Sequence, residues 1–196
     1  MPVRSPYGIA TQPARTAAKV FVAIVAGSDA PLVATPEMLR CWRRLTPLAV
    51  WSAVSVGRGN SEEILRSLTT QVARQNVEPH RLILLAEGNT ARAALELVLQ
   101  GVIDCAGLLA ITAPSAPLSF PIVPTAAAIR LVVRHQDRQD APADLITALS
   151  ASYVDTRIIG FDGLAANDLR AAASAAETFV LELVANASRQ NRHHGA

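Results

Sequence analysis

Short apolar runs alternate with segments of helical periodicity along most of this chain. The runs are rich in β-branched residues and end at turns that contain glycine, serine or asparagine. The pattern predicts strands at residues 19–26, 48–56, 81–86, 107–112, 129–134 and 156–159. It predicts helices at residues 36–45, 89–100, 143–152 and 166–187. One more helix follows Asn60, an N-cap residue with Glu63 three positions later, and runs to about residue 75.

Strands that are apolar throughout and alternate with helices are typical of a parallel sheet that is buried on both faces. Right-handed crossovers then place helices on both faces of the sheet. We therefore expect an α/β fold, a three-layer, doubly wound and mostly parallel sheet, over residues 19–187. Residues 1–18 are expected to be an N-terminal arm or an edge strand, and residues 188–196 a polar C-terminal tail that frays.

The amino-acid composition indicates which partners and which cellular compartment to expect. Hydrophobic residues make up 51% of the chain and aromatic residues only 4%, so alanine, valine, leucine and isoleucine must build the core. The formal net charge of +2 and the scattered arginines give no reason to expect nucleic acid binding. The apolar run at 20–26 follows Arg15 and Lys19 and faintly resembles a secretory signal. It is far shorter than the roughly 20 residues that span a bilayer, so we interpret it as a buried strand and expect no membrane partner.

The chain offers no spacing of metal ligands and no phosphate-binding glycine motif, so we expect neither a metal nor a cofactor. Its two cysteines, Cys41 and Cys105, are best interpreted as two thiols in a reducing, cytoplasmic environment.

The stretch VEPHRLILLAEGNTARAAL at residues 77–95 predicts a strand, a short turn and an alanine-rich helix. It resembles the nucleophile region of the phospholipase/carboxylesterase family of α/β-hydrolases, which includes the acyl-protein thioesterases. Residues 106–114 resemble the next strand of that family with its closing loop, and residues 131–137 resemble the strand and loop that carry the catalytic acid. The resemblance implies a minimal α/β-hydrolase-like domain without a lid domain, related to carboxylic-ester hydrolases.

The turn has lost the residue that does the chemistry. In such hydrolases a Gly-x-Ser-x-Gly turn exposes a serine above the sheet, and the following N–H helps to bind the oxyanion. Here Ala86 stands at the first glycine, Gly88 at the serine and Thr90 at the last glycine. Gly88 cannot attack an ester, although it enters the strained elbow conformation without the penalty that a Cβ brings. Alternatively, residues 87–89 form a tight turn of another doubly wound fold.

The resemblance to these hydrolases also requires a triad histidine, and none stands at the expected position. It places the triad histidine in the turn at residues 160–165, where Leu164 stands roughly at its position. The four histidines of the chain are His80, His135, His193 and His194. Asp137 and Asp140 follow the strand at 129–134, and either fits the acid position. Without a histidine, both are interpreted as helix-capping or solvated loop residues.

These observations favour a pseudoenzyme, an α/β-hydrolase-like protein that acts as a binding or interaction module. Its partner would be a small molecule or a protein, including a second copy of the chain in a homodimer. Ser28, Gly88 and Asn89 are the candidate ligand-binding residues, because backbone N–H groups at such turns can bind negative charge. A second hypothesis is an esterase or thioesterase with Thr90 or another hydroxyl as nucleophile. A third is a different doubly wound domain that binds a small anion at the turn of Gly88 and Asn89.

Overall fold

The computed structural model describes residues 20–27, 36–57, 60–112, 117–134, 143–161 and 165–193. Its strands are β1 (Val20–Ala26), β2 (Ala49–Ser55), β3 (Leu82–Glu87), β4 (Gly107–Ile111), β5 (Ala128–Arg134) and β6 (Thr156–Phe161). Its helices are α1 (Pro36–Leu45), α2 (Ser61–Gln75), the 3-10 turn η1 (Pro79–Arg81), α3 (Gly88–Leu99), α5 (Ala143–Ala151) and α6 (Ala165–His193). The alternation that the hydrophobic pattern predicts is confirmed.

The described strands form one sheet in the order β2-β1-β3-β4-β5-β6. Each neighbouring pair is parallel, as the uniformly apolar runs predict. Because the strands are parallel, all their carboxyl ends meet at one edge of the sheet. In open α/β sheets ligands bind beyond that edge.

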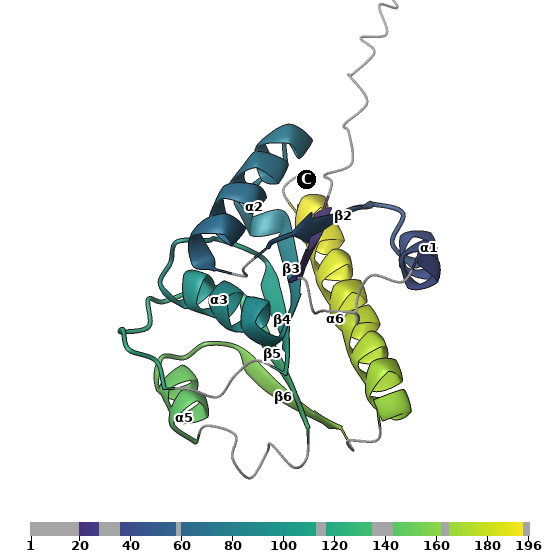
Figure 1. The fold of residues 1–196 in the computed structure, drawn as a ribbon. Coiled ribbons are helices and arrows are strands. Elements are labelled where there is room, and N and C mark those ends of the chain that lie inside the picture. Colours follow the sequence, from purple (N-terminus) through teal and green to yellow (C-terminus); the bar gives the residue numbers. More distant parts are fainter. Residues whose placement is uncertain are drawn as a thin grey trace, which may run out of the picture.

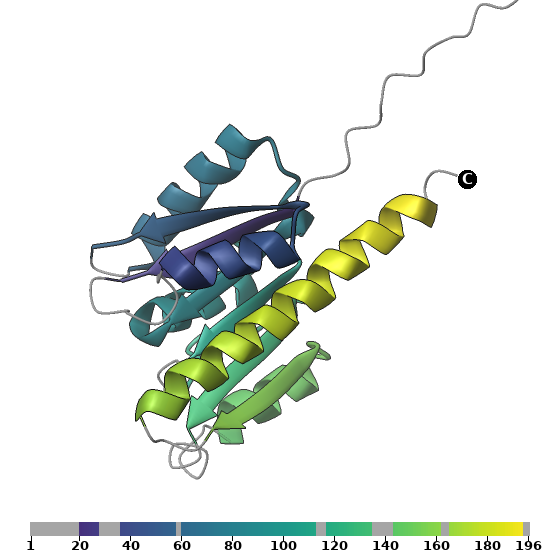
Figure 2. The ribbon, with the colours of Figure 1, turned by 90° about the vertical axis from the view of Figure 1, so that its right-hand side faces the viewer.

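Helices cover both faces of the sheet. Figure 1 shows α2, α3 and α5 on one side and α1 and α6 on the other, and Figure 2 shows α1 and α6 from their own side. The core accordingly has two parts. One lies under α2, α3 and α5, and the other lies under α1 and α6. The three-layer arrangement predicted for residues 19–187 is therefore confirmed for the described part of the chain.

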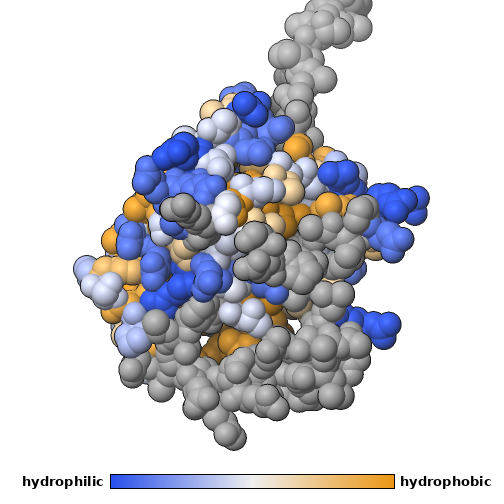
Figure 3. Space-filling view, in the orientation of Figure 1, coloured by the Kyte–Doolittle hydropathy of each residue, from blue (hydrophilic) through white to orange (hydrophobic). Residues whose placement is uncertain are grey.

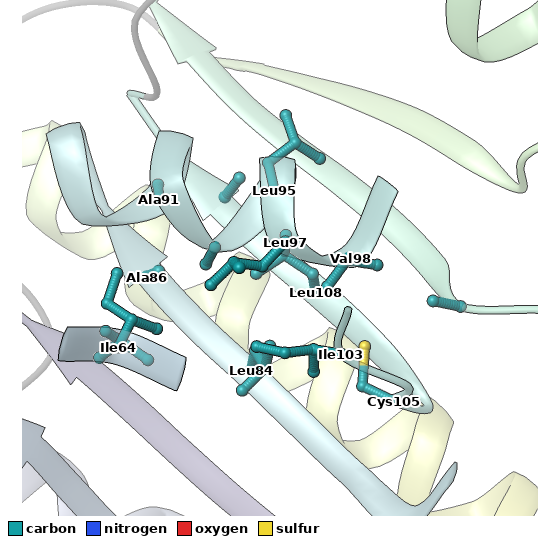
Figure 4. Close-up of a cluster of buried hydrophobic side chains, with 14 of the residues drawn as sticks. Ile64, Leu84, Ala86, Ala91, Leu95, Leu97, Val98, Ile103, Cys105 and Leu108 are labelled. Atoms are coloured by element: carbon teal, nitrogen blue, oxygen red, sulfur yellow. The ribbon is translucent and has the colours of Figure 1, made fainter. Parts of the chain in front are cut away.

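The core under α3 shows how the apolar runs are used. Leu95 and Val98 of α3 lie over Leu84 of β3 and Leu108 of β4 (Figure 4). All four are fully buried. Fully burying such a side chain contributes about 1.5–3 kcal/mol, so this contact fixes α3, and hence the turn before it, against the sheet.

Local signals in the sequence set several helix ends. Asn60 caps α2, and its Oδ1 accepts a hydrogen bond from the backbone N–H of Glu63 at 2.8 Å. Asn76 ends α2 with a φ of 50°, and Gly101 follows α3 with a φ of 71°. Strongly hydrophilic residues gather over α2 on the outer surface (Figure 3).

The last helix is longer than the sequence pattern predicts. We expected it to end near residue 187 and the polar residues after it to fray, but α6 continues to His193. The extension carries no glycine or proline that would stop the helix, and Arg189 within it is exposed. Arg189 Nη2 donates a hydrogen bond to Asn186 Oδ1 at 2.6 Å, which links neighbouring turns there.

Candidate functional site

The candidate site is built on the carboxyl ends of β1, β3, β4 and β5. The register of the sheet aligns Val25 with Ala86, Glu87 with Ile111, and Ile111 with Val132. Residues one or two positions further along therefore follow one another across the edge of the sheet. They are Gly27, Gly88, Thr112 and Val133.

Gly88 forms the sharp turn between β3 and α3. Its φ of +56° lies in the left-handed region, where a Cβ is unfavourable by roughly 1–2 kcal/mol. A Cβ built on Gly88 would meet no atom within 4 Å among the described residues. The backbone conformation favours glycine here, whereas the surrounding packing does not require it. A strained elbow that the described residues leave uncrowded is the geometry expected at a nucleophile position.

Thr90 holds this turn in place. Its side chain is buried, and its Oγ1 lies 3.2 Å from the carbonyl oxygen of Val25 and 2.6 Å from that of Glu87. The hydroxyl therefore joins the first turn of α3 to the ends of β1 and β3. Its Cγ2 would lie 3.2 Å from a Cβ on Gly27, so the two chain segments are closely packed. A buried hydroxyl that is engaged in this way is poorly placed to act as a nucleophile.

Thr112 was not recognised from the sequence as part of the site. It follows β4 directly, has a φ of +47°, and donates its backbone N–H to the carbonyl oxygen of Val132 at 2.8 Å. Left-handed φ is rare for β-branched residues, and such strain clusters at functional sites. Thr112 and Gly88 thus place two left-handed residues side by side on adjacent strands. Position 112 holds neither a glycine nor an asparagine, so no local signal in the sequence indicates this conformation.

Asn89 supplies the polar surface of the turn. It is exposed in the first turn of α3, where N–H groups have no acceptor within the helix. The first turn carries no acidic side chain, and the N-cap residue, Glu87, makes no side-chain hydrogen bond to these N–H groups. Of the candidate ligand-binding residues, Gly88 and Asn89 are neighbours in the sequence at the start of α3, and Ser28 lies outside the described residues.

The other triad positions, Asp137, Asp140 and Leu164, also lie outside the described residues. The same holds for His135 and His194. His80 lies in η1 at the amino end of β3, with its Nε2 3.3 Å from Glu78 Oε2. A strand of this length separates it from Gly88 by about 20 Å.

His193 ends α6, which starts after the carboxyl end of β6 and extends for about 43 Å. It is therefore at the far end of the molecule from the turn. Neither histidine of the described part of the chain is near Gly88.

The described residues contain no cluster of three or more histidine, cysteine, aspartate or glutamate side chains that could hold a metal ion. Within the same residues, no helix has the length and apolar character needed to cross a membrane.

The parallel sheet and its helix layers match solved structures that have the α/β-hydrolase fold. No protein family model matches the chain, and no curated protein matches its sequence. The assignment therefore depends on similarity to solved structures.

Several of these structures are esterases or related hydrolases. The fluorophosphonate-binding serine hydrolase FphF of Staphylococcus aureus is 9% identical, with 91% of this chain and 89% of that chain covered and a TM-score of 0.61. Esterase PE8 is 18% identical, with 85% and 94% covered and a TM-score of 0.58. A phospholipase/carboxylesterase from Dyadobacter fermentans is 10% identical, with 83% and 91% covered and a TM-score of 0.53. At such identities the similarity confirms the fold alone.

Proposed function

We propose that this chain is a noncatalytic α/β-hydrolase-fold protein that binds a ligand over the turn at Gly88. The observation that carries the proposal is the turn itself, which has a left-handed conformation, no described atom within 4 Å of a Cβ at position 88, and no hydroxyl. Removing a nucleophilic serine from an intact triad lowers the rate of hydrolysis by about 10⁶. A fold that keeps the elbow and lacks the serine retains a binding surface without the chemistry.

The ligand is a small molecule with a negatively charged or strongly polarised oxygen, such as a carboxylate. The exposed start of α3 directs N–H groups toward the space above Gly88, and the helix dipole adds a partial positive charge there. Because the position carries no side chain, a ligand atom can approach the backbone more closely than it could beside a serine.

The alternative of an esterase with Thr90 as nucleophile has less support. The Thr90 hydroxyl is 3% exposed and lies within hydrogen-bond distance of two backbone carbonyl oxygens. To attack an ester it would have to leave both oxygens and move out of the core. It would also need a base to take its proton.

The first test is reactivity of the purified chain with a fluorophosphonate probe and with p-nitrophenyl and thioester substrates. We expect neither labelling nor turnover above that of a heat-denatured sample. Labelling of the folded protein at one residue, located by mass spectrometry, would show an activated nucleophile and overturn the proposal.

A Gly88→Ser variant sharpens this test because the new side chain enters open space. We expect slow labelling of that residue and no ester turnover, since a hydroxyl without a general base is a weak nucleophile. If the variant reacts as fast as an intact serine hydrolase, a base must be present in the site and the protein is closer to an enzyme than we propose.

Binding itself is tested by titrating ¹⁵N-labelled protein with acetate. We expect saturable shifts of the amide signals of Gly88 and Asn89. A Gly88→Asn variant should weaken these shifts, because asparagine tolerates the left-handed conformation and its side chain occupies the space above the turn. Unchanged amide signals throughout the titration would exclude this turn as a carboxylate site.

A further inference from the structure

A groove of about 490 Å³ lies between α6 and the strands β5 and β6. Arg130, Arg157 and Ile159 line it from the sheet, and Ala171, Ala175 and Phe179 line it from the helix. Figure 2 shows α6 crossing this face of the sheet diagonally. The groove is on the face of the sheet that α1 and α6 cover, away from the turn at Gly88 (Figure 1 and Figure 2). Its volume falls in the range of small-molecule sites.

The groove exists because the side chains of α6 differ in size along the helix. Over β4 the helix presents Phe179 and Leu183, which approach so closely that a Cβ on Gly107 would lie 2.8 Å from each. Earlier in the helix the side chains that line the groove are small, namely Ala171, Ser174, Ala175 and Thr178. Such small side chains fill less of the space beside β5 and β6 than Phe179 and Leu183 fill over β4.

The floor of the groove carries two adjacent positive charges. Arg130 of β5 pairs directly with Arg157 of β6 in the parallel register, and both side chains line the groove. Neighbouring strands are about 4.8 Å apart, and like charges directly opposite each other on one face are destabilising. Asp155 and Glu182 offset the charge of Arg130, and an anion at Arg157 would compensate the second guanidinium group.

Arg130 is a buried cation whose Nη1 donates to the carbonyl oxygen of Ile129 at 3.1 Å and whose distances to carboxylates are longer. It is 3% exposed, and its Nη1 and Nη2 each lie 3.3 Å from a carboxylate oxygen of Asp155. Its Nη2 lies 3.6 Å from Glu182 Oε1, and its guanidinium carbon is 5.8 Å from the centre of the Phe179 ring. Charge-assisted hydrogen bonds of this kind are usually about 2.7–2.9 Å long. Arg92 Nε and Glu96 Oε1 in the same protein are 2.6 Å apart.

The groove also has two chemically different ends. Arg130 and Arg157 come early in their strands, level with Phe179 and Glu182 of α6. Ile159 lies one pleat further toward the carboxyl edge, where α6 begins, so it is nearer to Ala171 and Ala175. One end is therefore charged and the other apolar.

We propose that this groove binds a small organic carboxylate with an apolar body. Arg157, which is exposed, donates to the carboxylate in the planar two-point geometry that suits guanidinium. The apolar body lies against Ile159, Ala171 and Ala175. Asp155 and Glu182 offset the charge of Arg130, so the two arginines and the two carboxylates sum to zero, and Arg157 supplies the positive charge that the head group meets.

The proposal is tested with hexanoate as the probe, by NMR titration of the full chain. Hexanol has the same apolar body without the charge, and acetate has the charge with almost no apolar body. We expect hexanoate to saturate shifts in β5, β6 and α6, and both comparison compounds to bind at least about tenfold more weakly, a difference of roughly 1.4 kcal/mol.

Variants separate the site from a general charge effect. Arg157→Gln should weaken hexanoate binding by at least about tenfold. Arg74→Gln makes the same change of charge at an exposed position of α2, on the opposite face, and should leave binding unchanged. Ala171→Leu should also weaken binding by filling the apolar end. Circular dichroism checks that each variant is folded.

Three results would overturn the proposal. In the first, hexanoate at about 1 mM or above does not saturate the NMR shifts. In the second, hexanol binds as tightly as hexanoate. In the third, Arg157→Gln and the unchanged protein bind hexanoate with equal affinity. Because the signals of Gly88 and Asn89 report the other site, failure here is distinguishable from failure of the proposed function.

Discussion

Two glycines in this molecule have different physical reasons to be glycine. Gly107 opens β4 in the interior, where a Cβ would lie 2.7 Å from the backbone oxygen of Ala128 and 2.8 Å from both Phe179 and Leu183. Gly88 lies at the carboxyl edge, where a Cβ would meet nothing within 4 Å among the described residues. Packing requires the first glycine, and only the left-handed backbone favours the second.

The comparison shows which missing side chain has functional meaning. No side chain fits at position 107 without movement of the backbone or of α6, so its absence is a condition of the fold. At position 88 the described residues leave room for a hydroxyl. The absence of a nucleophile there is consequently a chemical property of this protein that its packing does not impose.

The difference between the two glycines is tested most directly by adding one methyl group at each position. Gly107→Ala is expected to lower the free energy of unfolding by about 3 kcal/mol, because the methyl group collides with backbone that cannot rotate away. Urea denaturation measures the loss. Gly57→Ala is the matched control, since its Cβ would lie 3.7 Å from Glu63 Oε1, an ordinary contact. An equal loss in both variants would show that the close approach of α6 to β4 is not what fixes Gly107.

Thr90 gives the next largest effect, because it anchors the turn that Gly88 forms. Thr90→Val keeps the shape of the side chain but removes its hydroxyl from two carbonyl oxygens, so we expect a loss of about 2 kcal/mol in urea denaturation. Thr90→Ser keeps the hydroxyl and should be the less destabilised of the pair. If the serine variant is the weaker one, packing of the Thr90 methyl group against Gly27, and not hydrogen bonding, holds the turn.

Gly88→Ala should have a smaller effect than either. We expect a loss of about 1 kcal/mol, which comes from the left-handed φ alone. Gly88→Asn should lose less than the alanine variant, because asparagine visits this conformation more readily. A loss as large as that of Gly107→Ala would mean that the space above the turn is occupied in solution, which would count against an open binding site.

The sequence predicts the elements of this fold well because their signals are local. Pro36 and Asn60 mark helix starts, and uniformly apolar runs mark buried parallel strands. The predicted end of α6 was wrong, because polar residues after residue 187 indicate exposure and do not by themselves end a helix. The order of strands in the sheet is not encoded in the hydrophobic pattern of any one segment.

The candidate site was only partly accessible to sequence reasoning. The likeness of residues 77–95 to a nucleophile turn led to Gly88, whose left-handed φ the structure bears out. The strain at Thr112 depends on tertiary context, and so does the groove beside Arg130. That groove arises from residues of β5, β6 and α6, which meet only after folding. Ser28, Asp137, Asp140 and Leu164 stay predictions because they lie outside the described residues.

The smallest expected effect concerns the packed interior near Gly107 and its dependence on pH. Burial, with a further contribution from the charge of Asp104, raises the pKa of the Cys105 thiol from 9.0 to about 12. An unfolded chain loses this proton near pH 9, whereas the folded chain keeps it, so stability is unaffected below pH 9 and falls as pH rises toward 12. At pH 9.5 the loss should be less than about 1 kcal/mol.

The measurement compares urea denaturation of the unchanged protein and of a Cys105→Ala variant between pH 7 and pH 10. The variant should lose less stability over that range, although its smaller side chain lowers its stability at every pH. Cys41, which is exposed, provides an internal reference for alkylation by iodoacetamide at pH 8. We expect Cys41 to react while Cys105 stays unmodified in the folded protein. Equal rates for the two thiols would mean that the amino end of β4 opens readily and that the interior around Gly107 is not closely packed.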